Sequence, residues 1–314
     1  MLLNNNYSCM NSLLGFAVAD ALGVPVEFSA RESLDQNPVT GMRGFGTYNL
    51  PAGTWSDDTS MTLATIKAVA DNGCFDLEAV MKNFDAWLFN AEFTSAGDTF
   101  DVGNTCSKAI YGWHLHKMTP AQAGCGGIRD NGNGSLMRFL PVPFYCIKKE
   151  LPDEQILNLC NDVSSLTHSH DISRLGCYIY THFMIDIIKG IAPDEAYGRL
   201  QGTDYGAFSE ESISVYSRIL KDDISKLARD DIKSSGYIVD TLEAAFWCNL
   251  TEKNYGGAVL KAVNLGHDTD TVGAITGSIA GVLYGSESIP KEWLETLIKR
   301  EYIEELAESF DRAL

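Results

Sequence analysis

GHDTDTVGAITGSIAGVLYG, residues 266–285, decides the fold class of this chain. Its glycines recur every four residues from Gly273 to Gly285, on one face of a helix. Small residues at that spacing let two helix backbones approach closely, as they do in membrane helix pairs. Asp270 and Glu287 leave only 16 residues between them, whereas a membrane span needs about 20. The stretch therefore predicts a buried helix packed closely against another helix, and no membrane span.

The rest of the chain has the same helical periodicity, and strict two-residue alternation is scarce. A short hairpin is compatible with the sequence, but no βαβ rhythm is visible, so we expect an all-α protein. No Pro- or Ser-rich linker and no internal repeat divides the chain, which predicts a single domain over residues 1–314. The predicted helices are Ser12–Leu22, Thr59–Ala70, Leu77–Phe89, Asp153–Val163, Ser173–Ile188, Tyr237–Cys248, Tyr255–Asn264 and Pro290–Leu314.

Composition limits the partners of the chain. Its 314 residues include 24 basic and 42 acidic side chains, a net charge of −18. Such a surface repels phosphate backbones and anionic lipid, so we expect no nucleic-acid and no membrane partner. The eight cysteines are never closer than 14 residues, so they form no zinc clip. Dispersed thiols and a start that does not resemble a signal peptide predict a cytoplasmic protein.

Two acidic clusters open predicted helices. Ser56 stands at a natural N-cap position before Asp57 and Asp58. Asp268, Asp270 and Thr271 open the glycine-faced helix. Carboxylates in a first turn stabilise a helix by about 0.3–1 kcal/mol, so capping alone is one interpretation of each cluster. Together, however, the clusters offer only oxygen donors, which Mg²⁺ and Mn²⁺ prefer. Two helix starts facing one cleft would hold a pair of such ions.

A phosphatase is an alternative interpretation of the second cluster. Asp268-x-Asp270-x-Val272 matches the DxDx[TV] pattern of haloacid-dehalogenase-type phosphatases. In those enzymes the first aspartate is a nucleophile at the end of a buried strand near the N-terminus. Here the pattern follows a helical segment, opens a helix and lies near the C-terminus, so this alternative is remote.

Five motifs in order resemble the ADP-ribosylglycohydrolase family, which includes the dinitrogenase reductase-activating glycohydrolase. Together they run through nearly the whole chain, and their order makes the resemblance specific. Two positions depart from the family pattern, which commonly has Gly where Ala19 and His267 stand. The motifs are ADALGVPVEF (19–28), WSDDTSM (55–61), NGSLMR (133–138), THSH (167–170) and NLGHDTDTVGAI (264–275).

The resemblance implies a compact multi-helix orthogonal bundle with a cleft that binds two Mg²⁺ or Mn²⁺ ions. On the matching positions, Ser56, Asp57 and Asp58 would hold one metal ion, Asp268 and Thr271 the other, and Asp270 would bridge them. The resemblance also makes Glu27 a metal ligand or an acid/base group. From the residues alone, Glu27 is interpreted as a solvated helix cap and would not be singled out.

The glycine-rich loops then become candidates for the diphosphate of a nucleotide, because glycine lets backbone N–H groups approach closely. We expect substrate contacts from Gly103, Asn104, Asn133, Gly134 and Ser135, with Arg138 as a fixed charge. Without the resemblance these are ordinary surface loops. His168 is a candidate ligand contact or a structural hydrogen-bonding group, and His267 would place a ring beside the substrate.

The implied reaction is metal-dependent hydrolysis of the bond between ADP-ribose and an amino-acid side chain of a modified protein, with ADP-ribose as product. Asp101 is the candidate acid/base group and Asp98 the competing one. Arginine is the expected acceptor. The alternatives are a serine-linked or small-molecule substrate, and a catalytically silent relative that binds ADP-ribose.

Overall fold

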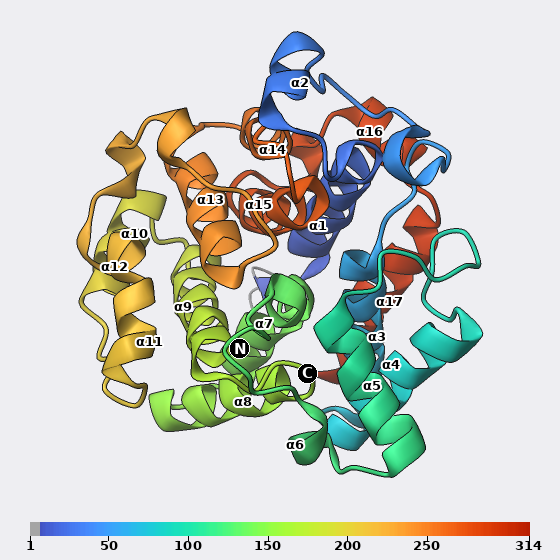
Figure 1. The fold of residues 1–314 in the computed structure, drawn as a ribbon, viewed down its shortest axis with the longest axis vertical. Coiled ribbons are helices and arrows are strands. Elements are labelled where there is room, and N and C mark those ends of the chain that lie inside the picture. The colour runs from blue at the N-terminus through green and yellow to red at the C-terminus, as the bar shows by residue number, and fades with distance from the viewer. Residues whose placement is uncertain (1–6) are drawn as a thin grey trace.

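The computed structural model describes residues 7–314, and within that range it contains helices and isolated β-bridges but no strand (Figure 1). The prediction of an all-α protein is therefore confirmed. The longer α-helices are α1 (Met10–Gly23), α3 (Asp57–Asn72), α4 (Leu77–Asn90), α5 (Asn104–His116), α8 (Asp153–Ser165), α9 (Asp171–Ile188), α13 (Ile238–Thr251), α14 (Tyr255–Val263), α15 (Thr269–Tyr284) and α17 (Arg300–Ala313). The shorter ones are α2 (Arg31–Gln36), α6 (Pro120–Ala123), α7 (Pro141–Lys148), α10 (Pro193–Gln201), α11 (Glu210–Val215), α12 (Ser217–Lys221) and α16 (Lys291–Thr296). The 3₁₀ helices are η2 (Val24–Val26), η3 (Gly46–Tyr48), η4 (Asn133–Arg138), η5 (Ile224–Lys226), η6 (Arg229–Asp231) and η7 (Ser286–Ser288).

The glycine-faced helix α15 lies at the centre of the molecule beside α1 (Figure 1). Each of its residues from Thr269 to Gly281 is buried. A Cβ atom at Gly277 would clash with the carbonyl oxygen of Gly15, and one at Gly281 with that of Asn11. The helix is therefore buried and closely packed, as the spacing of its glycines predicts, and α1 is the partner.

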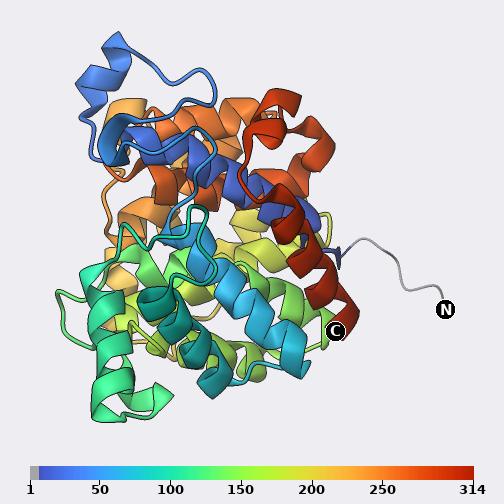
Figure 2. The same cartoon turned by 90° about the vertical axis from the view of Figure 1, so that its right-hand side faces the viewer.

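A large apolar core surrounds this pair and includes residues from Cys9 to Phe310. A smaller apolar cluster lies between α3, α4 and α5. The C-terminal helix α17 packs against α1 and α3 (Figure 2). Among residues 7–314, no helix is both long enough and apolar enough to cross a membrane. This packing holds the first turns of α3 and α15 at the C-terminal end of α1.

One predicted helix is wrong as a single element. Residues 290–314 form two helices, α16 and α17, separated by a turn in which Lys299 is left-handed, with φ of 55°. The backbone N–H of Ile298 donates to the carbonyl of Gly53 at 3.0 Å, and the indole of Trp55 donates to the Ile298 carbonyl at 2.8 Å. These bonds to a distant segment replace the helical bonds that local periodicity predicts.

Candidate metal centre and active site

The first acidic cluster is fixed by a carboxylate from another helix. Ser56 is the N-cap of α3, and its side chain accepts from the N–H of Asp58 at 3.3 Å. The fully buried carboxylate of Asp20, on α1, accepts from the N–H of Ser56 at 3.0 Å and from the N–H and hydroxyl of Thr59 at 3.1 and 2.5 Å. Helix α1 thereby fixes the position of Asp57 and Asp58 in the first turn of α3.

The second cluster does not cap its own helix. Asp268 is the N-cap residue of α15, but its side chain makes no capping hydrogen bond. Its Oδ2 instead accepts from the amide of Asn133 at 2.9 Å. The hydroxyl of Thr271 donates to Oδ1 of Asp58 at 3.3 Å, which joins the two clusters across 213 residues of sequence. The two helix starts therefore face one site.

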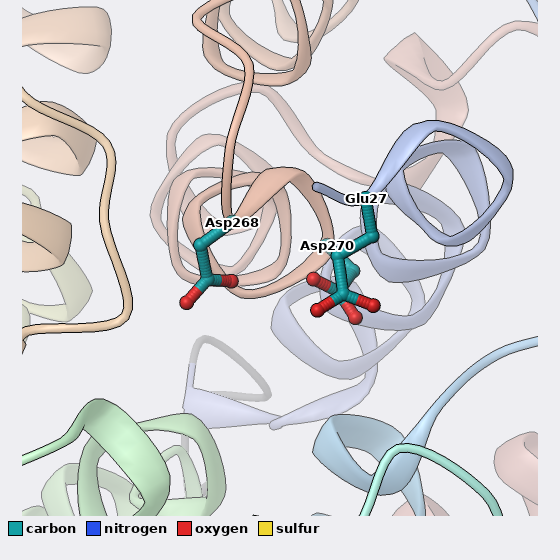
Figure 3. Close-up of side chains that lie close together, drawn as sticks. All are labelled: Glu27, Asp268 and Asp270. Carbon is teal, nitrogen blue, oxygen red and sulfur yellow. The ribbon is translucent and has the colours of Figure 1, made fainter. Parts of the chain in front are cut away.

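Three carboxylates converge at that site. Glu27, Asp268 and Asp270 each offer an oxygen within 4.8 Å of the others (Figure 3). Both oxygens of Asp270 and Oδ2 of Asp58 are buried and have no hydrogen-bond partner within residues 7–314. Unpartnered buried carboxylate oxygens are costly, and a bound cation removes that cost. The all-oxygen donor set thus fits a hard divalent cation.

The electrostatics of the cluster lead to the same conclusion. Burial raises the pKa of Glu27 to about 9, and the nearby charge of Asp101 adds to this rise, while the hydroxyl of Tyr48, which donates to Oε2 at 2.6 Å, opposes it. Burial, followed by repulsion from neighbouring carboxylates, raises the pKa values of Asp57 and Asp270 well above the ordinary range. A divalent cation would reverse these shifts by favouring the charged forms.

A cavity of about 230 Å³ opens over the cluster. Its wall combines the carboxylates with glycine-rich backbone from the first turn of α5 and from the start of η4. The residues that line it are Glu27, Phe28, Asp57, Asp58, Asp101, Gly103, Asn104, Thr105, Cys106, Gly132, Asn133, Gly134, Met137, His168, Gly236, Asp268 and Thr271.

Comparison with known proteins decides the family. The family model described as ADP-ribosylglycohydrolase matches residues 7–314. The chain belongs to the ADP-ribosylglycohydrolase family. The chain is 33% identical over 300 residues to ADP-ribosylarginine hydrolase Tri1 of Serratia proteamaculans, covering 95% of this chain and 77% of that protein. It is 30% identical over 295 residues to ADP-ribosyl-[dinitrogen reductase] glycohydrolase of Rhodospirillum rubrum, covering 92% and 89%.

The solved structures give the same assignment. An ADP-ribosylglycohydrolase-related protein complex superposes with a TM-score of 0.82 at 27% identity, covering 99% of both chains. The fold and family expected from the five motifs are therefore confirmed. The phosphatase alternative is wrong, because Asp268 opens a helix of an ADP-ribosylglycohydrolase fold and follows no strand.

The cavity of this ADP-ribosylglycohydrolase brings together most of the predicted substrate contacts: Gly103, Asn104, Asn133, Gly134 and His168 all line it. Burial lowers the pKa of His168 to about 3, with a smaller contribution from the Arg138 charge, so its ring is neutral. Its Nδ1 lies 2.8 Å from the hydroxyl of Thr167. A Cβ at Gly134 would come within 2.9 Å of the His168 ring. The glycine is therefore needed for this close packing.

Three predicted substrate contacts do not line the cavity. Arg138 is fully buried, with its guanidinium donating to Thr167 Oγ1 at 2.7 Å and to the carbonyl of Val163 at 3.1 Å. Ser135 is also fully buried and accepts from the thiol of Cys177 at 3.5 Å. His267 is exposed and borders a neighbouring cavity of about 420 Å³. The structure therefore does not support direct contacts from these three, because packing orients their side chains elsewhere.

The competing acid/base candidates are also placed differently. Asp101 lines the cavity, whereas Asp98 is exposed and does not.

The sequence did not predict two residues of the site, Asp20 and Tyr48. Asp20 had a signal, since it is the one carboxylate in the apolar stretch SLLGFAVADAL. Tyr48 had none, because it lies in a polar loop whose contact with Glu27 only the folded chain creates.

Proposed function

We propose that this chain hydrolyses the N-glycosidic bond between ADP-ribose and an arginine side chain of a modified protein. The observation that carries the proposal is the buried carboxylate cluster, with unpartnered oxygens on Asp58 and Asp270, in a chain of this family. Relatives at 33% identity bear the name ADP-ribosylarginine hydrolase. Its partner is thus an ADP-ribosylated protein, and ADP-ribose is its product.

Two Mg²⁺ or Mn²⁺ ions are the proposed cofactors. Ser56, Asp57 and Asp58 would hold one ion, Asp268 and Thr271 the other, and Asp270 would bridge them. When bound, the ions supply Lewis acidity and fix the orientation of the ribose hydroxyls and a water molecule. The unpartnered oxygens of Asp270 support the bridging assignment.

Glu27 and Asp101 are the proposed acid/base and ligand groups of the chain itself. Glu27 is held by the Tyr48 hydroxyl at 2.6 Å, and its backbone carbonyl accepts from Thr47 Oγ1 at 2.7 Å. Asp101 faces the same cavity, and its carboxylate raises the pKa of Glu27. A carboxyl group whose pKa is raised in this way, as that of Glu27 is, holds a proton near neutral pH and can transfer it to a leaving group.

The nucleotide is proposed to bind along the glycine-rich wall. Gly103 is the N-cap residue of α5 and Asn104 its first residue, and both line the cavity. Helix N-termini attract phosphate because their N–H groups are unpaired and carry partial positive charge. Asn133 and Gly134, at the start of η4, also line the cavity, and the neutral His168 ring packs against Gly134.

Charge favours arginine over serine as the acceptor. Two divalent cations would neutralise four of the six carboxylate charges around the site, and with Glu27 protonated as the acid group a net negative charge still remains. A guanidinium group is attracted by that charge, whereas a neutral serine linkage is not. The carboxylates counted are Glu27, Asp57, Asp58, Asp101, Asp268 and Asp270.

The test is a panel of arginine- and serine-linked ADP-ribosyl peptides, with release of ADP-ribose as readout. We expect cleavage of the arginine linkage, loss of turnover with a chelator, and recovery with Mg²⁺ or Mn²⁺. Cleavage of only the serine linkage would change the acceptor, and binding of ADP-ribose without any cleavage would identify a catalytically silent relative.

The proposal also includes two expectations from the sequence. They are a single domain over residues 1–314 and the cytoplasmic location predicted from dispersed cysteines.

A further inference from the structure

Two bulky residues next in sequence to the carboxylates Glu27 and Asp268 have a backbone conformation that favours glycine. Phe28 and His267 both have φ of 61°. A left-handed conformation is unfavourable for an L-residue, because Cβ then crowds the following carbonyl oxygen. The N–H of Phe28 donates to the carbonyl of His267 at 2.6 Å, and the N–H of His267 donates to the carbonyl of Ser29 at 2.8 Å. These bonds lock the strained pair, and such strain typically marks functional positions.

Phe28 also leaves a large apolar surface in water. Its side chain is 68% exposed even though it lines the active-site cavity. Phe45 is a natural comparison within the same chain, because it is 64% exposed, has φ of 66° and does not line the cavity. Among the described residues that line the cavity, Phe28 is therefore the one Phe, Tyr or Trp, and its ring is largely exposed.

The size of the cavity places part of the substrate on its rim. Pockets that enclose a drug-sized ligand measure about 300–1,000 Å³, and this one measures about 230 Å³. A nucleotide linked to a protein side chain must extend past it. Phe28 directly follows Glu27, whose carboxylate lies within 4.8 Å of those of Asp268 and Asp270. Phe28 therefore lines the same cavity as Glu27 and Asp268.

We propose that the Phe28 ring is the acceptor-side wall of the active site and stacks on the guanidinium group of the ADP-ribosylated arginine. This inference rests on the proposed function. A planar cation over an aromatic face is attracted by the ring's electrons, and guanidinium is the side-chain cation best suited to this geometry. The backbone hydrogen bond at Phe28 fixes where its side chain leaves the backbone before substrate arrives, which reduces the entropy lost on binding.

The test compares three variants: Phe28→Leu, Phe28→Tyr and the matched control Phe45→Leu. The readouts are kcat/KM on an arginine-linked ADP-ribosyl peptide and the inhibition constant of free ADP-ribose, which lacks a guanidinium. We expect Phe28→Leu to lower kcat/KM by about 2- to 30-fold, the range of a cation–π contact. Phe28→Tyr and Phe45→Leu should stay near the wild-type value, and the inhibition constant should not change in any variant.

Several results would overturn this role. If Phe28→Leu had a normal kcat/KM, the ring would have no role in binding the acceptor. An inhibition constant that weakens by the same factor as kcat/KM places the ring on the nucleotide instead. An equal loss in Phe45→Leu shows a general effect of the surface. Absence of wild-type turnover on the arginine-linked peptide overturns the proposed function itself, so the two failures are distinguishable.

Discussion

Asp20 shows how one buried carboxylate on α1 organises a site to which it contributes no ligand. Its two oxygens accept hydrogen bonds from three donors at the first turn of α3: the N–H groups of Ser56 and Thr59 and the hydroxyl of Thr59. In Asp20→Asn, an amide NH₂ would face these donors, leaving buried groups unpaired. We expect a loss of about 1–3 kcal/mol in unfolding free energy and about 10- to 100-fold weaker Mn²⁺ binding. Urea unfolding and calorimetric titration measure the two effects.

The control for this change is Asp71→Asn at the other end of α3. Asp71 is exposed and pairs only with Lys67 at the surface. Exposed pairs contribute about 0–1 kcal/mol, so this variant should keep nearly wild-type stability and metal affinity. If Asp20→Asn behaved like Asp71→Asn, the carboxylate on α1 would have no organising role.

Asp270→Asn separates metal binding from helix capping. If Asp270 bridges two cations, the substitution removes a charge that both need, and turnover should fall by about 100-fold or more. The metal-free variant should be at least as stable as the wild type, because one of several repelling carboxylates is gone. Hydrolysis assays and thermal unfolding in chelator measure both. If the variant kept normal turnover and normal metal stoichiometry, Asp270 would serve only as a carboxylate in the first turn of α15. Asn can replace such a carboxylate with little loss of stability.

At the scale of helices, the contact between α1 and α15 holds the two halves of the site together. In Gly277→Ala, the new methyl group would clash with the Gly15 carbonyl and the Ala19 side chain. We expect a loss of about 1–3 kcal/mol in unfolding free energy and reduced turnover, since α15 carries Asp270. Gly198, in α10, has nothing within 4 Å of such a methyl group. Gly198→Ala should instead gain about 0.4–1 kcal/mol. Equal effects at both sites would contradict a close-packed interface.

Local sequence pattern predicts these elements well where the determinant is local. Thr59–Ala70 was predicted and α3 spans Asp57–Asn72, because a capping Ser56 and a left-handed Gly73 bound it. The break before α17 was missed because it depends on Gly53, about 245 positions away in sequence. Helix α5 is missing altogether from the predicted helices, since the glycine- and polar-rich sequence that leads into it favours a loop on composition alone.

Across the whole molecule, the acidic site is built from residues that are far apart in sequence. Motif order indicated which side chains belong together, and the structure brings them around one cavity. What pattern alone does not give is side-chain direction. Arg138 belongs to one of the five motifs, yet its side chain is fully buried. Its guanidinium carbon lies 4.9 Å from the centroid of the Phe84 ring. The tertiary packing of α4 and η4, not the motif, decides where that charge lies.

The stability of the whole protein should therefore depend on pH and metal together. The folded-state pKa of Glu27 is about 9, against an ordinary value of 4.5, and burial also raises that of Asp57. A carboxyl whose pKa is raised on folding contributes stability that is fully present below about pH 4.5 and is lost as pH rises through about 9. Metal-free protein should thus show a Tm that falls from pH 5 to pH 9.

Metal ions should oppose that fall. Divalent cations bind the deprotonated carboxylates and only in the folded state, so the Tm increase from Mg²⁺ or Mn²⁺ should grow with pH. Thermal unfolding in chelator and in excess metal at pH 5, 7 and 9 measures this directly. In Asp270→Asn, which removes one of these carboxylates, both the pH dependence and the metal response should shrink. A metal-free Tm that is constant or rises over this range, and does not respond to either ion, would mean that the cluster binds no cation.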